Sequence, residues 1–157
     1  MSIAYLETPL GIAILKGDKN GLQSVSVVEQ IEDSTTSIPE ELQDAVSQLR
    51  EYFEGNRIEF DLKLNPQGTE FQKRVWDQLL TIPYGKTATY MDMAKQLGDP
   101  KCIRAAASAN GKNPLWIIVP CHRVIASDGS LTGYAGGLSR KKWLLEHENP
   151  VKQQSLF

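Results

Sequence analysis

Short apolar runs occupy most of the first thirty positions and predict β-strands. Residues 2–8 and 10–16 form two such runs on either side of Pro9. Residues 22–29 alternate between apolar and polar side chains, and the glycine-bounded segment 17–21 predicts a turn before them. The start of the chain is therefore predicted to be β structure.

The pattern changes to a helical period at residues 37–56. Ser37 and Glu40 match a capping box, and Pro39 falls in the first turn. Gly55 predicts the C-terminal end of the helix. The apolar face of the helix consists of Leu42, Ala45, Val46, Leu49, Tyr52 and Phe53.

Alternation returns at residues 58–64 and predicts another strand. Its apolar positions are Ile58, Phe60, Leu62 and Leu64. The segment NPQG at residues 65–68 contains two strong breakers of regular structure and marks a domain boundary.

Charge divides the chain at the same place. Residues 1–66 contain 5 Lys and Arg against 12 Asp and Glu, a net charge of −7, whereas residues 67–157 contain 12 against 7, a net charge of +5. A polyanion would bind the C-terminal half, although two lobes of different surface composition would give the same numbers. We expect an N-terminal lobe at 1–66, a second domain at 67–150 and a tail at 151–157.

Three helices are predicted after the boundary. The first spans residues 69–82, and its buried positions are Phe71, Val75, Trp76, Leu79 and Leu80. Helices at 89–98 and 99–113 are joined by a tight glycine turn. Asp99 is the expected N-cap of the second, with Pro100 at its first position. This pair predicts a helix-turn-helix.

The second helix of this pair has a run of small residues, namely Ala105, Ala106, Ala107, Ser108 and Ala109. Small side chains let a helix backbone approach a partner closely. That partner is either another helix of the protein or an external molecule, and the pattern does not choose between them.

The last third of the chain predicts a strand, a hairpin and a helix. Residues 116–120 form an apolar strand, and residues 123–134 predict a β-hairpin around the turn SDGS. A hairpin beside two short helices indicates a winged helix-turn-helix. Residues 139–148 predict a final helix with Ser139 as its cap. The predicted fold class is α+β.

Composition narrows the class of protein. With 157 residues, 41% hydrophobic and 23% charged, the chain fits one ordinary or two small globular domains. No apolar run approaches the roughly 20 residues of a membrane span, and no signal peptide is apparent. The two cysteines and two histidines show no metal-ligand spacing. We expect a cytoplasmic protein with reduced thiols and no bound metal.

Candidate chemistry is concentrated where Cys121 and His122 follow the predicted strand. A thiolate is the nucleophilic form of cysteine, so Cys121 needs a base or a positive field. Adjacent side chains on extended backbone point in opposite directions, so direct contact requires a turn at Pro120–Cys121 or a bridging water. Glu148 is a candidate to orient the histidine. A buried inert cysteine beside a surface histidine is the alternative, and Cys102 is interpreted as a packing residue.

Several motifs together resemble the O6-alkylguanine-DNA alkyltransferases. They are TIPYGKTATY, the IRAAA helix, NGKNP, IIVPCHRVI and LTGYAGGLSRKKWLLEHE, in the family's order and spacing. The resemblance runs from about Thr69 to Glu148. It implies a small N-terminal α/β (ribonuclease H-like) lobe followed by a winged helix-turn-helix alkyltransferase domain.

The resemblance also implies catalytic roles. Cys121 matches the cysteine that accepts the alkyl group, and His122 matches the histidine that takes its proton through a water. Glu148 matches the glutamate that orients this histidine. Asn113 matches the asparagine that supports the site.

Further positions match the family's contacts to DNA. Arg104 matches the arginine that fills the base stack after the nucleotide is flipped out, and Tyr90 matches a tyrosine at the phosphate and guanine. The small Ala105 and Ala107 would let the helix enter the minor groove. The remaining matches are the carbonyl of Val124, Tyr134 in the loop that walls the pocket, and the backbone amide of Ala135 in the same loop.

The implied activity is direct DNA repair on double-stranded DNA. An alkyl group moves irreversibly from O6 of guanine, and also from O4 of thymine, to the protein's own cysteine without a cofactor. Each molecule acts once, after nucleotide flipping. Two other classes remain open: a winged-helix regulator with a sensing cysteine, and a Cys-His hydrolase that turns over.

The tail ends in QQSLF. It resembles the pentapeptide by which bacterial repair proteins bind the sliding clamp, through Gln153, Leu156 and Phe157. The alternative is a frayed end or a Leu-Phe pair that packs on its own domain. We expect a monomer.

Overall fold

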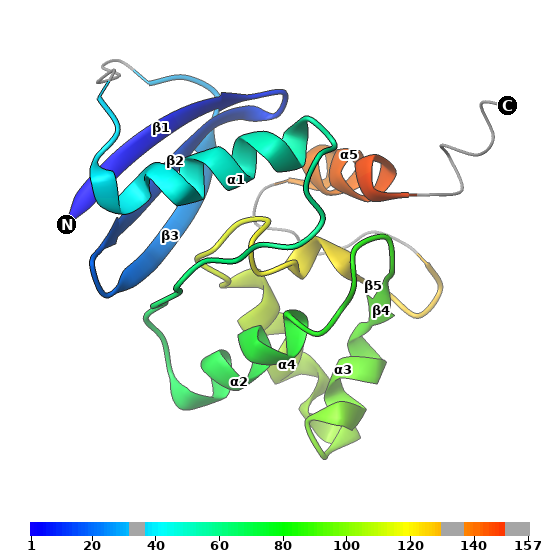
Figure 1. The fold of residues 1–157 in the computed structure, drawn as a ribbon. Helices are drawn as coiled ribbons and strands as arrows, with labels where there is room; N and C mark the ends of the chain where they lie inside the picture. Colours follow the sequence, from blue (N-terminus) through cyan, green and yellow to red (C-terminus); the bar gives the residue numbers. More distant parts are fainter. Residues whose placement is uncertain (32–36, 130–136, 150–157) are drawn as a thin grey trace, which may run out of the picture. The chain divides into compact units, whose positions relative to one another are not determined.

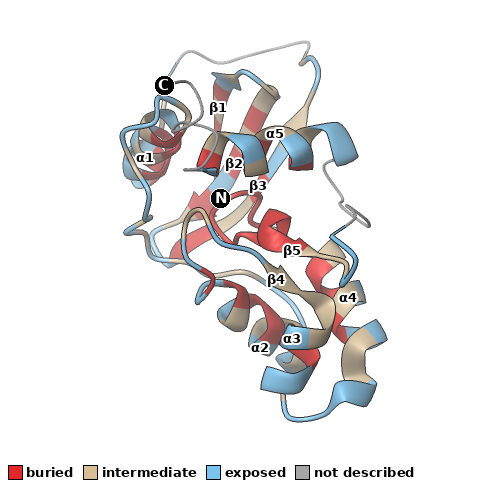
Figure 2. Cartoon of the chain, turned by 90° about the vertical axis from the view of Figure 1, so that its right-hand side faces the viewer, coloured by how far each residue is buried: buried red, intermediate tan, exposed pale blue. Residues whose placement is uncertain are grey.

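The computed structural model describes residues 1–31, 37–129 and 137–149. They form an α+β structure, as the sequence predicted (Figure 1). Buried residues occur on both its strands and its helices (Figure 2).

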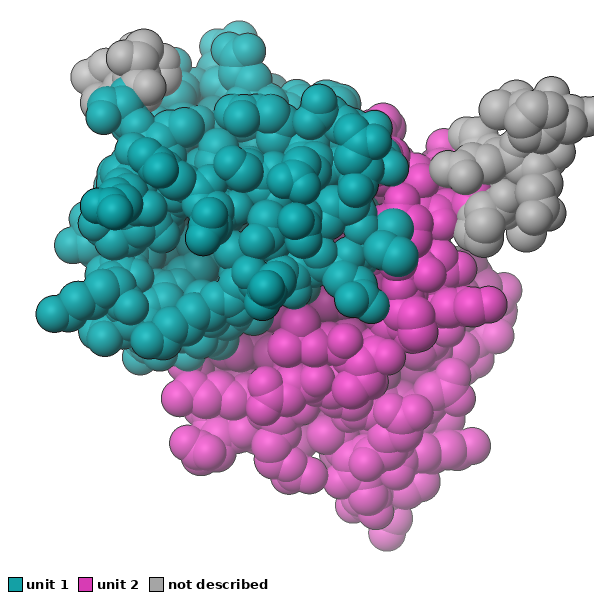
Figure 3. Space-filling view, viewed as in Figure 1, with its two compact units in different colours: residues 1–67, 114–118 teal, residues 68–113, 119–157 magenta. Residues whose placement is uncertain are grey.

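The chain folds into two compact units (Figure 3). Unit 1 consists of Met1–Gln67 together with Pro114–Ile118, and unit 2 consists of Gly68–Asn113 together with Val119–Phe157. The chain therefore returns to unit 1 for five residues before it continues into unit 2.

Unit 1 is a three-stranded antiparallel sheet with one helix. Strands β1 (Ser2–Thr8), β2 (Gly11–Asp18) and β3 (Gly21–Val28) lie in the order β1-β2-β3, and they match the predicted strands. A 3₁₀ turn, η1 (Glu40–Leu42), leads into α1 (Gln43–Phe53), which lies across the sheet (Figure 1). The buried side chains of the turn and helix are Leu42, Ala45, Val46, Leu49 and Tyr52.

The start of this helix differs from the prediction. Pro39 is the residue before the 3₁₀ turn, and no side chain caps that turn. Ser37 lies outside the helix, so the predicted capping box with Glu40 is wrong. Proline fixes its own φ and starts the turn without a hydroxyl cap.

The predicted strand at 58–64 is also wrong. Leu64 makes a single isolated bridge with Leu22, and Ile58 is 58% exposed. The side chain of Gln48 explains the difference, because it binds both backbone groups of Asp61. Its amide nitrogen donates to the Asp61 carbonyl at 3.0 Å, and its oxygen accepts from the Asp61 N–H at 2.9 Å. A helix side chain thus replaces a strand partner.

Unit 2 consists mainly of helices. Its helices are α2 (Glu70–Leu79), α3 (Tyr90–Gln96), α4 (Ile103–Gly111) and α5 (Leu138–Glu148), with 3₁₀ turns η2 (Pro100–Cys102) and η3 (Cys121–Arg123). Strands β4 (Ala88–Thr89) and β5 (Val124–Ile125) form a short parallel pair. No helix among the described residues is long and apolar enough to cross a membrane.

The predicted helix-turn-helix is formed by α3 and α4. Thr89 caps α3 in a capping box with Asp92, and Asp99 caps the following turn as predicted. Gly98 lies between them with φ of +103°, a left-handed conformation that side chains disfavour. This glycine allows the sharp change of direction between the two helices.

The run of small residues on α4 has two different faces. Ala106 and Ala109 are buried, and the indole N–H of Trp76 on α2 donates to the Ala109 carbonyl at 2.9 Å. Ala105 and Ser108 are exposed. One face therefore packs inside unit 2, and the other is available for an external partner.

Other predictions in this half are wrong. Residues 116–118 form a turn, in which Ile117 has φ of +71°, so 116–120 is no strand. Leu115 bridges Val25 of β3 instead. Leu80, predicted to be buried, is 47% exposed because α2 ends at Leu79.

The predicted hairpin at 123–134 differs in its first arm, because β5 pairs with β4 in parallel. Residues 130–136, which include its second arm, lie outside the described residues. At the last helix, Gly137 is the N-cap and Ser139 lies within α5, so the predicted Ser139 cap is wrong.

Candidate functional site

The Cys-His-Arg sequence forms a buried 3₁₀ turn. The N–H of Arg123 donates to the Pro120 carbonyl at 3.0 Å, which closes the turn. Cys121, His122 and Arg123 are 6%, 0% and 6% exposed. With three residues per turn, consecutive side chains project in different directions from one backbone segment. A turn therefore occurs at Pro120–Cys121, one of the two arrangements that would bring thiol and imidazole together.

Glu148, at the end of α5, binds two residues of this turn. Its Oε2 lies 2.7 Å from His122 Nε2, and its Oε1 accepts from Arg123 Nε at 2.8 Å. A second guanidinium nitrogen, Nη2, donates to Oε2 at 3.2 Å. Burial raises the pKa of Glu148, but the hydrogen bonds from His122 and Arg123 and the charge of Arg123 outweigh it and lower the pKa to about 2. The carboxylate is ionised at neutral pH.

The protonation of His122 follows from this partner. Burial lowers the pKa of the imidazole, and the bond to Glu148 opposes this change only in part. Because the carboxylate can only accept, Nε2 bears the proton of the neutral ring. Nδ1 is then an acceptor, and it has no hydrogen-bond partner within the described part of the chain. A water there would satisfy it and could pass a proton.

Cys121 is a thiol at rest. Burial raises its pKa, while a hydrogen bond from the Asn113 side chain and the charge of Lys141 lower it. Asn113 is itself held by a 2.7 Å hydrogen bond from its amide to the Val119 carbonyl. The thiol thus has a stabilising neighbour for its anion but requires a base to remove the proton.

Lys141 is fully buried on α5 beside this site. Its Nζ lies 5.9 Å from the centroid of the Tyr90 ring, a cation–π distance. Burial lowers the pKa of Lys141, and the nearby Cys121 opposes that change. A buried cation therefore lies close to both the thiol and the predicted DNA-contacting tyrosine.

The residues predicted to contact DNA lie mainly on the surface of the helix pair. Arg104 and Ala105 are exposed at the start of α4, Ala107 is half-buried, and Tyr90 is the half-buried first residue of α3. Val124 is buried directly after the Cys-His-Arg turn. The remaining predicted positions, Tyr134, Ala135, Gln153, Leu156 and Phe157, lie outside the described residues.

Sequence analysis missed Arg123 and Lys141. A signal for Lys141 existed, since Lys141, Leu144 and Glu148 follow the i, i+3, i+7 spacing of one helix face. All three are buried in the structure. No comparable signal identifies Arg123, because an arginine in a short turn is normally exposed.

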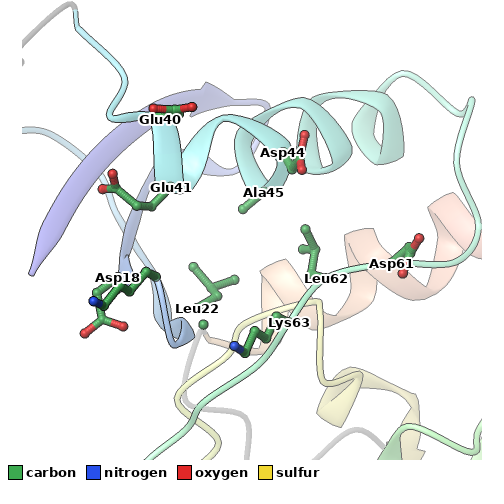
Figure 4. A pocket seen from close by; sticks show the side chains of 11 residues that line it. Asp18, Leu22, Glu40, Glu41, Asp44, Ala45, Asp61, Leu62 and Lys63 are labelled. Carbon is green, nitrogen blue, oxygen red and sulfur yellow. The ribbon is translucent and has the colours of Figure 1, made fainter.

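A hollow of about 280 Å³ lies in unit 1, apart from the Cys-His-Arg turn (Figure 4). Leu22, Ala45 and Leu62 face one another across it, and charged residues surround them. Five are acidic, namely Asp18, Glu40, Glu41, Asp44 and Asp61. Among the described residues, no group of three or more His, Cys, Asp or Glu is arranged to hold a metal ion, either here or at Cys121.

Comparisons with known proteins agree across nearly the whole chain. Residues 1–66 match the ribonuclease-like domain of 6-O-methylguanine DNA methyltransferase, and residues 70–150 match the DNA-binding domain of the same enzyme. A methylated-DNA–protein-cysteine methyltransferase from Methanosarcina acetivorans is 48% identical over 94% of this chain and 98% of its own. One of the same description from Mycobacterium bovis is 47% identical over 91% and 89%.

Solved structures give the same result. The Mycobacterium tuberculosis protein OGT in complex with DNA is 45% identical, with a TM-score of 0.85, and the match covers 97% of both chains. The O6-methylguanine methyltransferase of the same organism has a TM-score of 0.84 at 41% identity, covering 99% of both chains.

Proposed function

Because the chain belongs to the 6-O-methylguanine DNA methyltransferase family, we propose that it repairs DNA by moving an alkyl group from O6 of guanine to Cys121. The observation that supports these residue roles is the buried pair that Glu148 forms with His122, which lies on the same turn as the thiol. The neutral histidine contacts an ionised glutamate through Nε2 and leaves Nδ1 without a partner among the described residues, which is the arrangement that a general base requires.

The proposed reaction is an in-line displacement at the alkyl carbon. His122 Nδ1 takes the thiol proton through a water, and Glu148 stabilises the imidazolium that forms. The sulfur of Cys121 bonds to the alkyl carbon as the carbon–O6 bond breaks, and the electron pair goes to the guanine. The released proton finally resides on the guanine ring, so guanine and a thioether are the products. The thioether does not hydrolyse, and each molecule acts once.

The exposed face of α4 supports the proposed DNA contact. Arg104 and Ala105 lie at its exposed N-terminal end, while Ala106 and Ala109 hold the opposite face within unit 2. O6 of a paired guanine is inaccessible to a buried thiol, so the nucleotide has to leave the stack. We propose that Arg104 fills the vacated space and that Tyr90 contacts the flipped nucleotide.

Intact-mass spectrometry tests this function. After the protein is mixed with a duplex that contains one O6-methylguanine, we expect each protein molecule to gain one methyl group. Cys121→Ser should gain none. DNA binding without any gain in mass would favour a lesion sensor or regulator and would remove the catalytic roles of Cys121, His122 and Glu148.

The finer partner predictions remain proposals. We propose that QQSLF docks on a bacterial sliding clamp, that the protein is a monomer, and that it works in the cytoplasm, where its thiol stays reduced. A pull-down with purified clamp compares the full chain with one that ends at Lys152. Equal retention of both would exclude the docking.

A further inference from the structure

The Glu148 carboxylate contacts both His122 and Arg123, and the proposed reaction uses only His122. His122 contacts Oε2, while Arg123 contacts both oxygens. We propose that Arg123 is a positioning residue for alkyl transfer, because it fixes the carboxylate so that His122 presents Nδ1 toward the thiol. This inference rests on the proposed function and adds a residue to it.

The contacts of Arg123 hold its guanidinium in one orientation beside the Glu148 carboxylate. Nε and Nη2 bind the two carboxylate oxygens at 2.8 and 3.2 Å, and Nη1 donates to the Ile82 carbonyl at 2.7 Å. The guanidinium carbon lies 5.7 Å from the centroid of the Tyr84 ring. The Tyr84 hydroxyl in turn donates to the His147 carbonyl at 3.4 Å. The arginine is therefore held by a backbone carbonyl and an aromatic ring as well as by its ion pair.

This arrangement determines the direction of Oε2. A carboxylate can rotate about its last carbon–carbon bond, and one hydrogen bond from an imidazole would not prevent this. A two-point contact with a fixed guanidinium does prevent it. Because Oε2 points in one direction, the Nε2–H of His122 has one acceptor position, and Nδ1 on the other side of the ring is placed with it.

Arg123 also balances charge around the imidazole. The charged groups that act on His122 in the described structure are Arg123 on its own turn, and Lys141 and Glu148 on α5. Glu148 favours the imidazolium, which cannot accept the thiol proton, whereas Arg123 and Lys141 disfavour it. Burial is the largest cause of the lowered His122 pKa, and Arg123 adds to it, so that the ring stays neutral and able to act as a base.

Two substitutions separate the geometric role from the charge. Arg123→Lys keeps a positive charge but loses the two-point contact. Arg123→Gln removes the charge. We expect Arg123→Lys to react about tenfold more slowly with an unchanged dependence on pH. We expect Arg123→Gln to react slowly and, because His122 then protonates more readily, to lose activity at a higher pH than the wild type.

Single-turnover kinetics measure both effects. Protein is mixed with an excess of duplex containing O6-methylguanine at several pH values between about 5 and 9, and methyl gain is followed by mass spectrometry. The amplitude reports the folded fraction, and the rate constant reports the reaction in folded molecules. A merely structural role of Arg123 would lower the amplitude and leave the pH midpoint of the rate constant unchanged, which would overturn the inference.

The matched controls are Arg57→Lys and Arg57→Gln. Arg57 pairs with Glu51 through Nε at 3.2 Å, in unit 1 and partly exposed. Both variants should react as the wild type does. If the wild type itself gains no methyl, the proposed function fails. If it reacts normally but Arg123→Gln shows the wild-type midpoint, only the role of Arg123 fails.

NMR of the imidazole gives a readout that needs no DNA. The ¹⁵N shifts of His122 distinguish the Nε2–H tautomer from the imidazolium. The wild type should show the neutral Nε2–H form near pH 7. Arg123→Gln should show more imidazolium at the same pH, and an identical spectrum in both proteins would contradict the inference.

Discussion

Two arginine–glutamate pairs, Arg57–Glu51 and Arg123–Glu148, have related contacts and different surroundings. Arg57 donates through Nε to Glu51 and through Nη1 to the Glu59 carbonyl at 2.8 Å. Arg123 makes the same two kinds of contact, to Glu148 and to the Ile82 carbonyl. The side chains of the first pair are 28% and 40% exposed, whereas those of the second are 8% and 2% exposed.

The difference shows that burial determines how strongly the two partners of an ion pair depend on each other, and the buried pair also has a two-point contact that the exposed pair lacks. Water competes for the first pair and can replace either partner, so such pairs contribute little. The second pair has lost its water, so each partner depends on the other. In the second pair, the carboxylate of Glu148 also accepts a hydrogen bond from His122.

Removal of the acidic partner should produce the largest difference between the two pairs in the free energy of unfolding. Glu148→Ala leaves the guanidinium of Arg123 buried without its carboxylate, and we expect a loss of about 3–5 kcal/mol in the free energy of unfolding. Glu51→Ala should cost less than about 1 kcal/mol. Urea denaturation measures both, and equal losses would show that burial does not distinguish the pairs.

The next largest difference should be in how the stability contributions of the two glutamates depend on pH. The pKa of Glu148 is lowered in the folded state, so its contribution to stability is complete above the unfolded value of 4.5 and is lost as pH falls toward about 2. The shift corresponds to about 3 kcal/mol. Denaturation at several pH values should show this loss in the wild type and in Glu51→Gln. It should be absent in Glu148→Gln, and its persistence there would assign it to another group.

A third arginine sharpens the comparison, because its proposed partner is DNA. Arg104 is exposed on α4, so Arg104→Ala should change the unfolding free energy by less than about 0.5 kcal/mol. Its repair rate should fall about tenfold, on the order of 1.4 kcal/mol in the barrier, because the vacated stack is no longer filled. Single-turnover kinetics and urea denaturation of the same sample test both parts. A normal rate would remove Arg104 from the DNA contact.

The smallest expected difference between the two pairs is in how salt changes their contributions to the free energy of unfolding. At 1 M NaCl the screening length is about 3 Å, so the few tenths of a kcal/mol expected from the exposed Arg57–Glu51 pair should vanish. The cost of Glu148→Ala should persist, because ions do not reach the buried pair. Urea titrations at low and high salt measure this, and an equal salt effect on both variants would mean that water reaches Glu148.

Local patterns predicted much of the fold. The three strands of unit 1 and the helices α1 to α5 were predicted from apolar patterns, capping residues and helix breakers, and the Asp99 cap follows from its side-chain chemistry. The predicted strands at 58–64 and 116–120 failed for one shared reason. An apolar pattern shows that a segment can pair, but it does not show how far the pairing extends, and each of these segments makes only an isolated bridge to β3, at or next to one of its ends. Gln48 bonds the first segment, and Ile117 turns the second away.

The site was predictable in part. The proximity of His122 to Glu148 was expected from the resemblance, and the structure places them 2.7 Å apart, although their roles remain proposals. The burial of Arg123 was not predictable, because it depends on Ile82 and Tyr84, which are about forty residues away in sequence. Long-range partners of this kind leave no local pattern.

The return of residues 114–118 to unit 1 has a consequence for synthesis. The Val25 N–H donates to the Pro114 carbonyl at 2.9 Å, and the Val25 carbonyl accepts from the Trp116 N–H at 3.1 Å. A nascent chain of 67 residues has all three strands but leaves this edge of β3 without its partner. This edge can be filled only after residues 114–116 have left the ribosome, and Cys121 lies only a short way further along the chain. The nucleophile has therefore already been made before unit 1 can close.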